Sequence, residues 1–344
     1  MLPYGFYLVD GEPFSGHRLE QMRQLLNNVG LDYDNGIGVS VGICNGNDDM
    51  IAAASLQENI IKCVAVSPEY EALGLTAELL QYLFAKVSPN KTLFVYTKPK
   101  NRPLFECFGF AALANTGTVL LMERPRGSVG RFLESLPPPS GENIGAVVAN
   151  CNPMTLGHLW LIDSARKECD FLYVFVLSED KSEVPAKDRL EIVRRSCAQW
   201  ENVAVCPTGP YLVSSATFPA YFLKDKVLVN EQWCELDPLV FAQWFCPKLR
   251  ITKRYVGSEP FSPITAAYNK QLAKILPGFG ISVTELNRFA VCGQPVSATR
   301  VRALLRQNCR EDIRSLVPDA TWHYFCDLQN YASFLLRDTE MNLK

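Results

Sequence analysis

The chain has 344 residues with 34 basic and 36 acidic side chains, which gives a formal net charge of −2. Hydrophobic residues make up 48% of it, so packed cores are expected and extensive disorder is not. The balanced charge argues against a nucleic-acid partner, and the length favours two domains.

Two further properties bear on where the protein works. No apolar run is long enough to span a bilayer, and the N-terminal "MLPYGFYLVDGEP" lacks the basic start of a signal peptide, so no membrane partner is expected. The 12 cysteines contain no C-x-x-C pair, which argues against a zinc site or a thioredoxin-type motif. Many thiols without a secretory signal are typical of a reducing compartment, so we predict a cytoplasmic protein.

The elements expected in residues 1–124 indicate a mostly antiparallel sheet with helices packed on it. Apolar runs within 50–70 predict two strands, and a helical pattern follows over 76–87. The further expected elements are a strand at 91–97, a short helix at 101–110 and a strand at 117–123.

Residues 125–143 form a predicted Pro-rich linker. Pro137-Pro138-Pro139 followed by Ser-Gly can continue neither a helix nor a central strand, although a short helix at 130–136 is expected within the linker. The predicted domains are therefore 1–124 and 144–344.

The second domain alternates between apolar strands and helices. This alternation, with strands apolar on both faces, is typical of a Rossmann-like, doubly wound parallel sheet in an α/β protein. The expected strands are 144–150, 171–177, 203–207, 251–257 and 281–287, and the helices are 156–168, 186–200, 237–249 and 298–307.

The segment "NPMTLGH", residues 152–158, lies where the first of these strands gives way to a helix. Ligands of such sheets bind at the carboxyl ends of the strands, and a helix N-terminus there attracts anions. Thr155 can cap the helix or contact a phosphate oxygen, Gly157 allows a close backbone approach, and His158 can point at the same anion. A lone histidine favours a structural role, but T-x-G-H at this junction favours a phosphate site.

A second segment, "VSATRVR" at 296–302, begins the last expected helix. Ser297 and Thr299 stand at its start and Arg302 lies one turn further on. Backbone N–H groups, hydroxyls and a guanidinium in this arrangement can hold the β- and γ-phosphates of a nucleotide. Each motif is weak alone, whereas both together in this topology are strong.

At these two motifs the sequence resembles the nucleotidyltransferase superfamily that is related to class I tRNA synthetases. Those enzymes carry T-x-G-H or H-x-G-H after the first strand and I-S-S-T-x-x-R, or a variant, near the domain end. Three further segments, 175–193, 211–225 and 254–269, look like segments of citrate lyase ligase, and this resemblance covers most of the chain.

The resemblance implies an ATP-dependent, AMP-forming acetate ligase. Acetate is expected to react with MgATP to give acetyl-adenylate, and the acetyl group then passes to a dephospho-CoA-derived thiol on the acyl-carrier (gamma) subunit of citrate lyase. It implies His158, Thr155 and Arg302 as catalytic residues, whereas the Mg²⁺ ligands stay unknown. The nucleotide-binding residues would be Asn152, Pro153, Gly157, Gly257, Ser258, Glu259, Ser297, Ala298 and Thr299.

In that family an acetyltransferase-like domain of the GCN5-related type precedes the ligase domain. Residues 63–80 and 101–110 look like the pyrophosphate loop and final helix of that fold. Glu71 and Thr76 depart from the usual Q/R-x-x-G-x-G/A loop, although Gly74 is kept. A carboxylate there opposes anion binding, so we expect a scaffold or a docking surface for the carrier protein and not a working acetyltransferase.

Other polar residues have two interpretations. Glu179 and Asp180 could help to hold Mg²⁺ or shape the acyl pocket, or they could be a solvated pair. Asp188 and Arg189 are expected to be an ordinary pair on a helix face. The residues expected to line a loop near the nucleotide are Ser214, Ser215 and Thr217.

Three other functions stay open at this point. The chain could transfer a nucleotide to another small substrate, such as a coenzyme precursor phosphate. It could be an acetate ligase for a different thiol carrier, such as that of malonate decarboxylase. It could also be an acetyltransferase whose second domain only binds a nucleotide.

Overall fold

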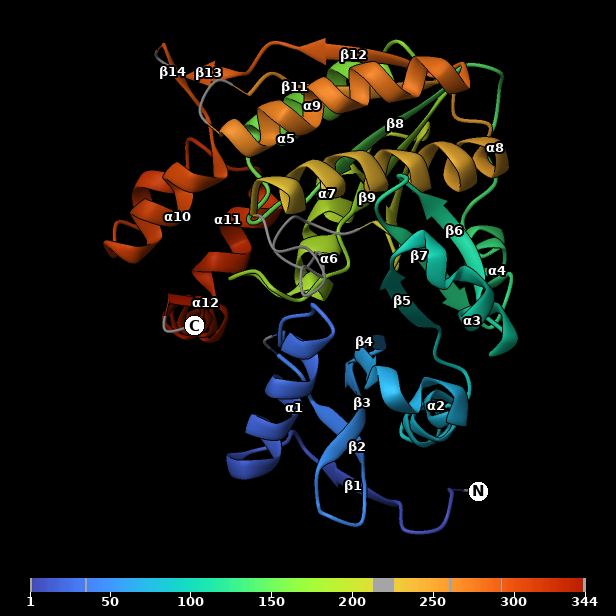
Figure 1. Ribbon diagram of the computed structural model, residues 1–344. Coiled ribbons are helices and arrows are strands. Elements are labelled where there is room, and N and C mark those ends of the chain that lie inside the picture. Colours follow the sequence, from blue (N-terminus) through green and yellow to red (C-terminus); the bar gives the residue numbers. More distant parts are fainter. Residues whose placement is uncertain (1, 35, 213–225, 260–261, 292, 343–344) are drawn as a thin grey trace. The chain divides into compact units, whose positions relative to one another are not determined.

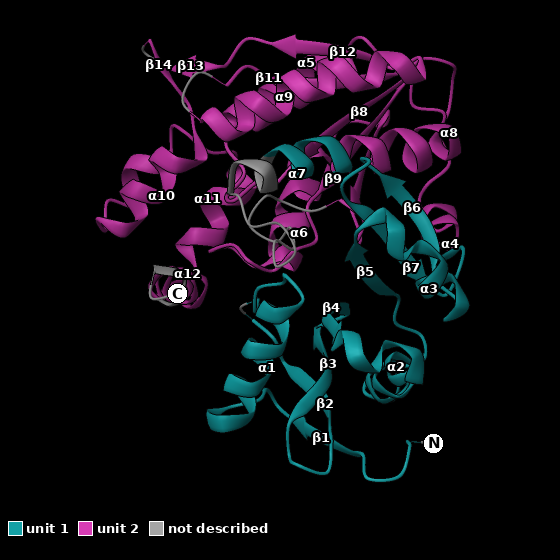
Figure 2. Ribbon diagram, in the orientation of Figure 1, with its two compact units in different colours: residues 1–128, 218–236 teal, residues 129–217, 237–344 magenta. Residues whose placement is uncertain are grey.

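The computed structural model describes residues 2–34, 36–212, 226–259, 262–291 and 293–342 (Figure 1). It divides into two units, residues 1–128 with 218–236 and residues 129–217 with 237–344 (Figure 2). The predicted domain boundaries at 124 and 143 stay predictions; the change of unit at 128 falls inside the expected linker. Within the described ranges, every helix is too short or too polar to cross a lipid bilayer.

The first unit contains a seven-stranded sheet in the order β1-β2-β3-β4-β5-β7-β6. Neighbouring strands are antiparallel except β4 and β5, which are parallel and pair only at Ile60–Phe94 and Ile61–Val95. The strands are β1 (Tyr7–Gly11), β2 (Val39–Cys44), β3 (Met50–Gln57), β4 (Ile60–Val66), β5 (Leu93–Thr97), β6 (Ala111–Asn115) and β7 (Leu120–Arg124).

Helices α1 (Gly16–Asn28) and α2 (Leu75–Ala85) pack on this sheet and, with the short α3 (Arg102–Cys107), complete the core. Leu79, Leu80 and Leu83 of α2 are fully buried because they recur on one face of the helix. The elements predicted between residues 50 and 123 are confirmed. Strand β6 was not predicted, and the strand expected to close the sheet, β7, lies between β5 and β6.

The second unit contains a five-stranded sheet, entirely parallel, in the order β10-β9-β8-β11-β12. Starting from the central β8, the chain adds strands first on one side and then on the other. Because such crossovers are right-handed, α5 (Leu156–Arg166) and α6 (Ala186–Cys197) cover one face and α9 (Pro263–Ile275) covers the other. The strands are β8 (Ile144–Ala149), β9 (Phe171–Val176), β10 (Val203–Pro207), β11 (Lys253–Gly257) and β12 (Ser282–Leu286).

The predicted α/β fold class, with a mixed antiparallel sheet followed by a doubly wound parallel sheet, is confirmed. One expected boundary was wrong: the helix predicted at 237–249 begins at Lys226 and passes through a π-helical stretch, Phe241–Phe245.

A short β13–β14 ribbon precedes α10 (Figure 1). The helices of this unit and the shared α7 are α4 (Ser128–Glu134), α5 (Leu156–Arg166), α6 (Ala186–Cys197), α7 (Lys226–Val240), α8 (Cys246–Leu249), α9 (Pro263–Ile275), α10 (Ala298–Arg306), α11 (Asp319–Cys326) and α12 (Leu328–Asn342), and the ribbon strands are β13 (Ala290–Val291) and β14 (Gln294–Pro295).

Candidate active site

A cleft of about 930 Å³ opens at the carboxyl ends of β8 and β11, within the second unit. It is bordered by the first turns of α5 and α10, so the fold brings together two motifs that lie about 140 residues apart in the sequence. The predicted site residues that line the cleft are Thr155, Gly157, His158, Gly257, Ser258, Glu259, Ser297, Ala298 and Thr299.

The start of α5 fixes the protonation state of His158. Thr155 caps the helix: its hydroxyl accepts a hydrogen bond from the His158 backbone N–H at 3.4 Å, and its own backbone N–H donates to His158 Nδ1 at 3.1 Å. A ring nitrogen that accepts a hydrogen bond carries no proton, so the neutral ring has its proton on Nε2. Burial, with the nearby charges of Arg288 and Arg302, lowers the pKa of His158 to about 4. His158 therefore offers a neutral N–H donor at physiological pH.

Gly157 is required by a contact within the protein. A Cβ atom at this position would lie 2.9 Å from the carbonyl oxygen of Val296, the residue just before Ser297. The glycine thus lets the start of α5 approach the segment that leads into α10. Gly157 also lines the cleft, so the expected close approach of a ligand stays a prediction beside this contact between the two motifs.

The start of α10 presents a second helix N-terminus to the cleft. Ser297 caps it by accepting a hydrogen bond from the Arg300 backbone N–H at 3.2 Å. Ala298 and Thr299 are the first residues of the helix and line the cleft, as does Arg300. Helix N-termini carry partial positive charge and backbone donors, so two of them at one cleft favour a ligand with several phosphates.

Arg302 is not among the residues that line the cleft. Its Nη1 donates to the carbonyl oxygen of Asn152 at 2.6 Å, its Nη2 donates to Thr299 Oγ1 at 3.3 Å, and its Nε lies 3.2 Å from Glu183 Oε1. Burial lowers the pKa of this guanidinium. In this arrangement Arg302 ties α10 to the T-L-G-H loop.

Asn152 and Pro153 are also buried outside the cleft. The Asn152 amide donates to the Glu183 carboxylate, and its Oδ1 accepts from the Val184 backbone N–H at 3.0 Å. These bonds hold the loop that carries Thr155 in place. For these two residues and Arg302 the structure therefore indicates a supporting position behind the motif.

Three arginines that sequence reasoning missed line the cleft: Arg254, Arg288 and Arg300. Arg288 donates to the Ser258 carbonyl oxygen at 2.7 Å and forms an ion pair with Glu259. A signal for Arg288 existed, because it follows directly after the strand predicted at 281–287, whose carboxyl end borders the ligand region. Arg300 occupies a variable position of the second motif, so the motif pattern gave no reason to select it.

Two acidic candidates lie elsewhere. Asp180 accepts from the Ala186 backbone N–H at 3.0 Å and pairs with Arg337 at 2.8 Å, so it supports the start of α6. Neither Asp180 nor Glu179 lines the cleft. Within the described ranges, no group of three His, Cys, Asp or Glu side chains is placed to hold a metal ion.

The expected pair of Asp188 and Arg189 on a helix face was wrong. Arg189 is fully buried and donates to the carbonyl oxygens of Val184 at 3.0 Å and Asn150 at 2.8 Å, and to that of Glu179. Asp188 instead accepts from the Tyr324 hydroxyl at 2.9 Å. The candidates that lie outside the described residues are Ser214, Ser215 and Thr217.

Comparisons with known proteins agree with the motifs. The model of the citrate lyase ligase C-terminal domain matches residues 144–325. The [citrate [pro-3S]-lyase] ligase of Escherichia coli (strain K12) is 35% identical over 327 residues, which cover 92% of each protein. That of Klebsiella pneumoniae is 37% identical over 288 residues, 81% of this chain and 84% of the relative. A solved structure, Thermotoga maritima TmcAL bound with alpha-thio ATP, is similar with a TM-score of 0.38 and 15% identity, over 58% of this chain and 56% of that one. The chain belongs to the citrate lyase ligase family.

Proposed function

We propose that the protein is an ATP-dependent, AMP-forming acetate ligase that acetylates the thiol of the prosthetic group on the acyl-carrier subunit of citrate lyase. Family membership supports the ligase activity and the citrate lyase target. The observation that carries the proposal is the cleft itself, where His158 and the N-termini of α5 and α10 meet at the carboxyl ends of parallel strands.

In the first step a carboxylate oxygen of acetate attacks the α-phosphorus of ATP. The new P–O bond forms as the bond to the β-phosphate breaks, and pyrophosphate leaves with the electron pair. No proton moves, so the protein contributes positioning and charge stabilisation. The neutral Nε2–H of His158 would donate to a non-bridging oxygen of the α-phosphate, where charge builds up in the transition state.

The β- and γ-phosphates would lie at the start of α10. The hydroxyls of Ser297 and Thr299, the first backbone N–H groups of the helix and the Arg300 guanidinium are the groups that can hold them. Arg302 would act as a positioning residue through Thr299 and Asn152.

A magnesium ion fits this cleft as part of the substrate and not as a resident of a protein-built cage. Glu259 supplies the only carboxylate among the described residues that line the cleft, and it is paired with Arg288. Mg²⁺ commonly keeps several waters and binds through substrate phosphates with few protein ligands. When bound, it offsets the negative charge of the phosphates.

In the second step the carrier thiol attacks the acetyl carbonyl of acetyl-adenylate. The C–S bond forms, the C–O bond to AMP breaks, and the thiol proton passes to solvent. The carrier then holds an acetyl thioester, and AMP leaves the cleft. The reaction as a whole converts ATP, acetate and the thiol into AMP, pyrophosphate and the thioester.

Trapping the intermediate tests this function. Incubation with ATP, Mg²⁺, acetate and hydroxylamine is expected to yield pyrophosphate and acetyl-hydroxamate together, both dependent on acetate. An enzyme that transfers a nucleotide to another substrate, which this mixture lacks, would give neither product, and so would an acetyltransferase, which requires acetyl-CoA. Purified carrier subunits of citrate lyase and malonate decarboxylase, offered in parallel, distinguish the partners; the names of the relatives favour citrate lyase.

A further inference from the structure

Arg254 of β11 is a buried cation whose hydrogen bonds are incomplete. Its side chain lines the cleft although the residue is only 2% exposed. Among the described residues, neither its Nε nor its Nη1 has an acceptor. Buried donors without acceptors are costly, and a buried charge is more costly still. A buried donor of this kind at a cleft indicates that a bound ligand supplies the missing hydrogen-bond acceptor.

The surroundings of Arg254 include two aromatic side chains and one acid. Its guanidinium lies 4.9 Å from the ring centroid of Phe241. The Tyr268 hydroxyl, which also borders the cleft, donates to the Asp237 carboxylate at 2.6 Å. Burial lowers the pKa of Arg254, whereas Tyr268 and Asp237 raise it. This environment suits a small anion with an apolar end.

Arg189 is a buried arginine outside the cleft, and its hydrogen bonds can be compared with those of Arg254. It is also fully buried, yet its Nε, Nη1 and Nη2 all donate to backbone carbonyl oxygens around the ends of β8 and β9. All three nitrogens of the Arg189 guanidinium therefore have backbone acceptors, whereas two of the Arg254 nitrogens have none among the described residues. Arg302 Nε is a further buried donor without a hydrogen bond, but it lies 3.2 Å from the Glu183 carboxylate, so of these three arginines only Arg254 lines the cleft with donors left over.

We propose that Arg254 binds the carboxylate of the acyl substrate and orients it toward the α-phosphate of ATP. This inference rests on the proposed function and adds the residue that selects a carboxylate. The phosphates already have two helix N-termini, His158 and Arg300, so a further arginine beside Phe241 is left for the second substrate. A planar guanidinium matches a carboxylate in geometry and charge, and the ring of Tyr268, which also lines the cleft, is the aromatic group available to the methyl group of acetate.

Steady-state kinetics of Arg254→Met and Arg254→Lys test the proposal. The loss of a charge-assisted hydrogen bond is expected to raise the KM for acetate about 30- to 100-fold in R254M, and less in R254K, which keeps the charge. The Kd for a non-hydrolysable ATP analogue, measured by calorimetry, should stay within about threefold of wild type because the phosphate contacts remain. An unchanged KM for acetate, or equal increases for acetate and ATP, would overturn the proposal.

Arg189→Met is the matched control for a structural role. It removes a fully bonded buried guanidinium, so it should lower Tm more than R254M does and leave the KM for acetate near wild type in the protein that stays folded. If R254M does not fold, R254K carries the test.

If the proposed function is wrong, the wild-type protein will form no acetyl-hydroxamate. This result distinguishes a failure of the proposed function from a failure of the proposal for Arg254. In that case calorimetric titration of acetate into wild type and R254K with the ATP analogue present still decides the role of Arg254. Binding to wild type with at least tenfold weaker binding to R254K supports it, and equal binding, or none to either protein, refutes it.

Discussion

The two units each contain a hollow, and the hollows differ in the groups that surround them. The cleft of the second unit combines two helix N-termini with a neutral histidine donor and arginines. The hollow of the first unit, about 400 Å³, lies where β4 and β5 stop pairing and is bordered by Glu71, Thr76, Lys98 and Lys100. Both units provide space for a ligand, so we expect the charged groups around each hollow to decide which one binds phosphates.

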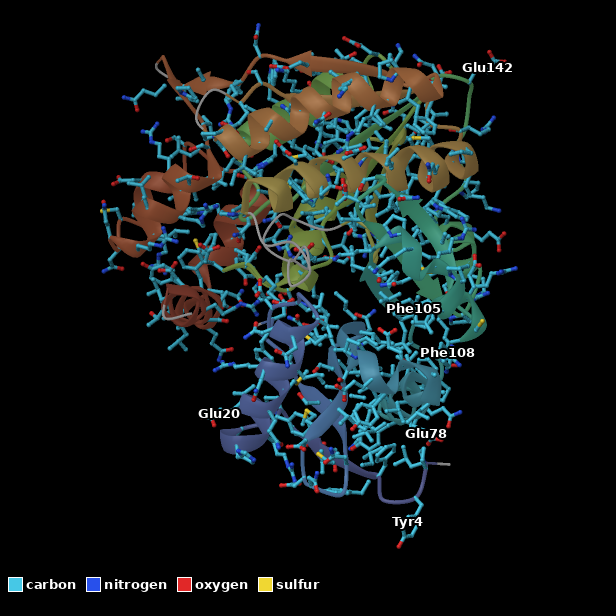
Figure 3. The ribbon with its side chains drawn as sticks, in the orientation of Figure 1. Tyr4, Glu20, Glu78, Phe105, Phe108 and Glu142 are labelled. Atoms are coloured by element: carbon cyan, nitrogen blue, oxygen red, sulfur yellow. The ribbon has the colours of Figure 1, made fainter. Side chains whose placement is uncertain are left out.

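The first hollow keeps the backbone of an anion site and two lysines, but a carboxylate stands beside its helix start. Gly74 adopts the left-handed conformation, with φ of 68°, that starts α2, and only glycine does so without strain. Glu71 precedes that helix start and lines the hollow together with the apolar side chain of Phe105, which is labelled in Figure 3. A carboxylate at a helix start competes with an anionic ligand for the same positive end of the helix. The comparison therefore predicts tight nucleotide binding in the second unit only.

Replacing His158 tests the stronger site most directly. His158→Ala removes the Nε2–H donor, so kcat for acetyl-hydroxamate formation should fall about 100-fold or more while the Kd for ATP changes little. His158→Gln is the matched control, because its amide can still donate and should restore part of the rate. If H158A retained the wild-type rate of pyrophosphate release, the cleft would not be the site of adenylation.

Arg300 lines the cleft and Arg302 does not, so replacing each arginine by methionine tests whether the first contacts ATP and the second supports the loop. Arg300→Met should raise the KM for ATP about tenfold with little change in Tm, because this side chain is exposed and lines the cleft. Arg302→Met should cost about 1–3 kcal/mol of stability, because the Asn152 carbonyl oxygen loses its donor and Glu183 loses one of its two cations. Thermal unfolding beside ATP titrations separates the two effects; an unstable R300M or a fully stable R302M would reverse the assignment.

The position of the cleft at the two motifs could be predicted from the sequence, because its determinants are local. T-L-G-H follows an apolar strand, and S-A-T opens an amphipathic helix, so strand ends and helix starts were visible as patterns. The parallel sheet followed from the alternation of apolar strands and helices for the same reason. These features depend on residues that are close together in the chain.

The side-chain contacts that the sequence did not indicate depend on tertiary burial. Arg302 turns to Glu183 because a carboxylate more than a hundred residues away in the chain reaches it. Arg189 looked like half of a surface pair, and only the fold shows it surrounded by the loops after β8 and β9. The missing acceptors of Arg254 are likewise invisible in sequence, since burial and hydrogen-bond partners are properties of the folded chain.

Two glycines that line the cleft test the contact between the start of α5 and the segment before α10, with a smaller expected effect. Gly157→Ala would place its Cβ 2.9 Å from the Val296 carbonyl oxygen, so α5 and the segment before α10 must separate. We expect a loss of about 1–3 kcal/mol in stability and a several-fold loss in kcat/KM for ATP. Gly257→Ala is the control for stability, because a Cβ atom added at Gly257 would meet nothing within 4 Å. Equal Tm values for the two variants would show that the close junction is not needed.

The smallest expected effect concerns the first unit. Glu71→Gln removes the carboxylate beside the start of α2 and leaves Lys98 and Lys100 in place, so binding of a pyrophosphate-containing probe such as dephospho-CoA should improve a few-fold at low salt. Adenylation in the second unit should not change, because its cleft keeps every group. Calorimetry with dephospho-CoA measures the gain, and Lys98→Gln is the matched control, expected to weaken binding. If E71Q left the affinity unaltered while K98Q lowered it, the hollow would already accept the anion with Glu71 present, and the difference in charge would not be what separates the two hollows.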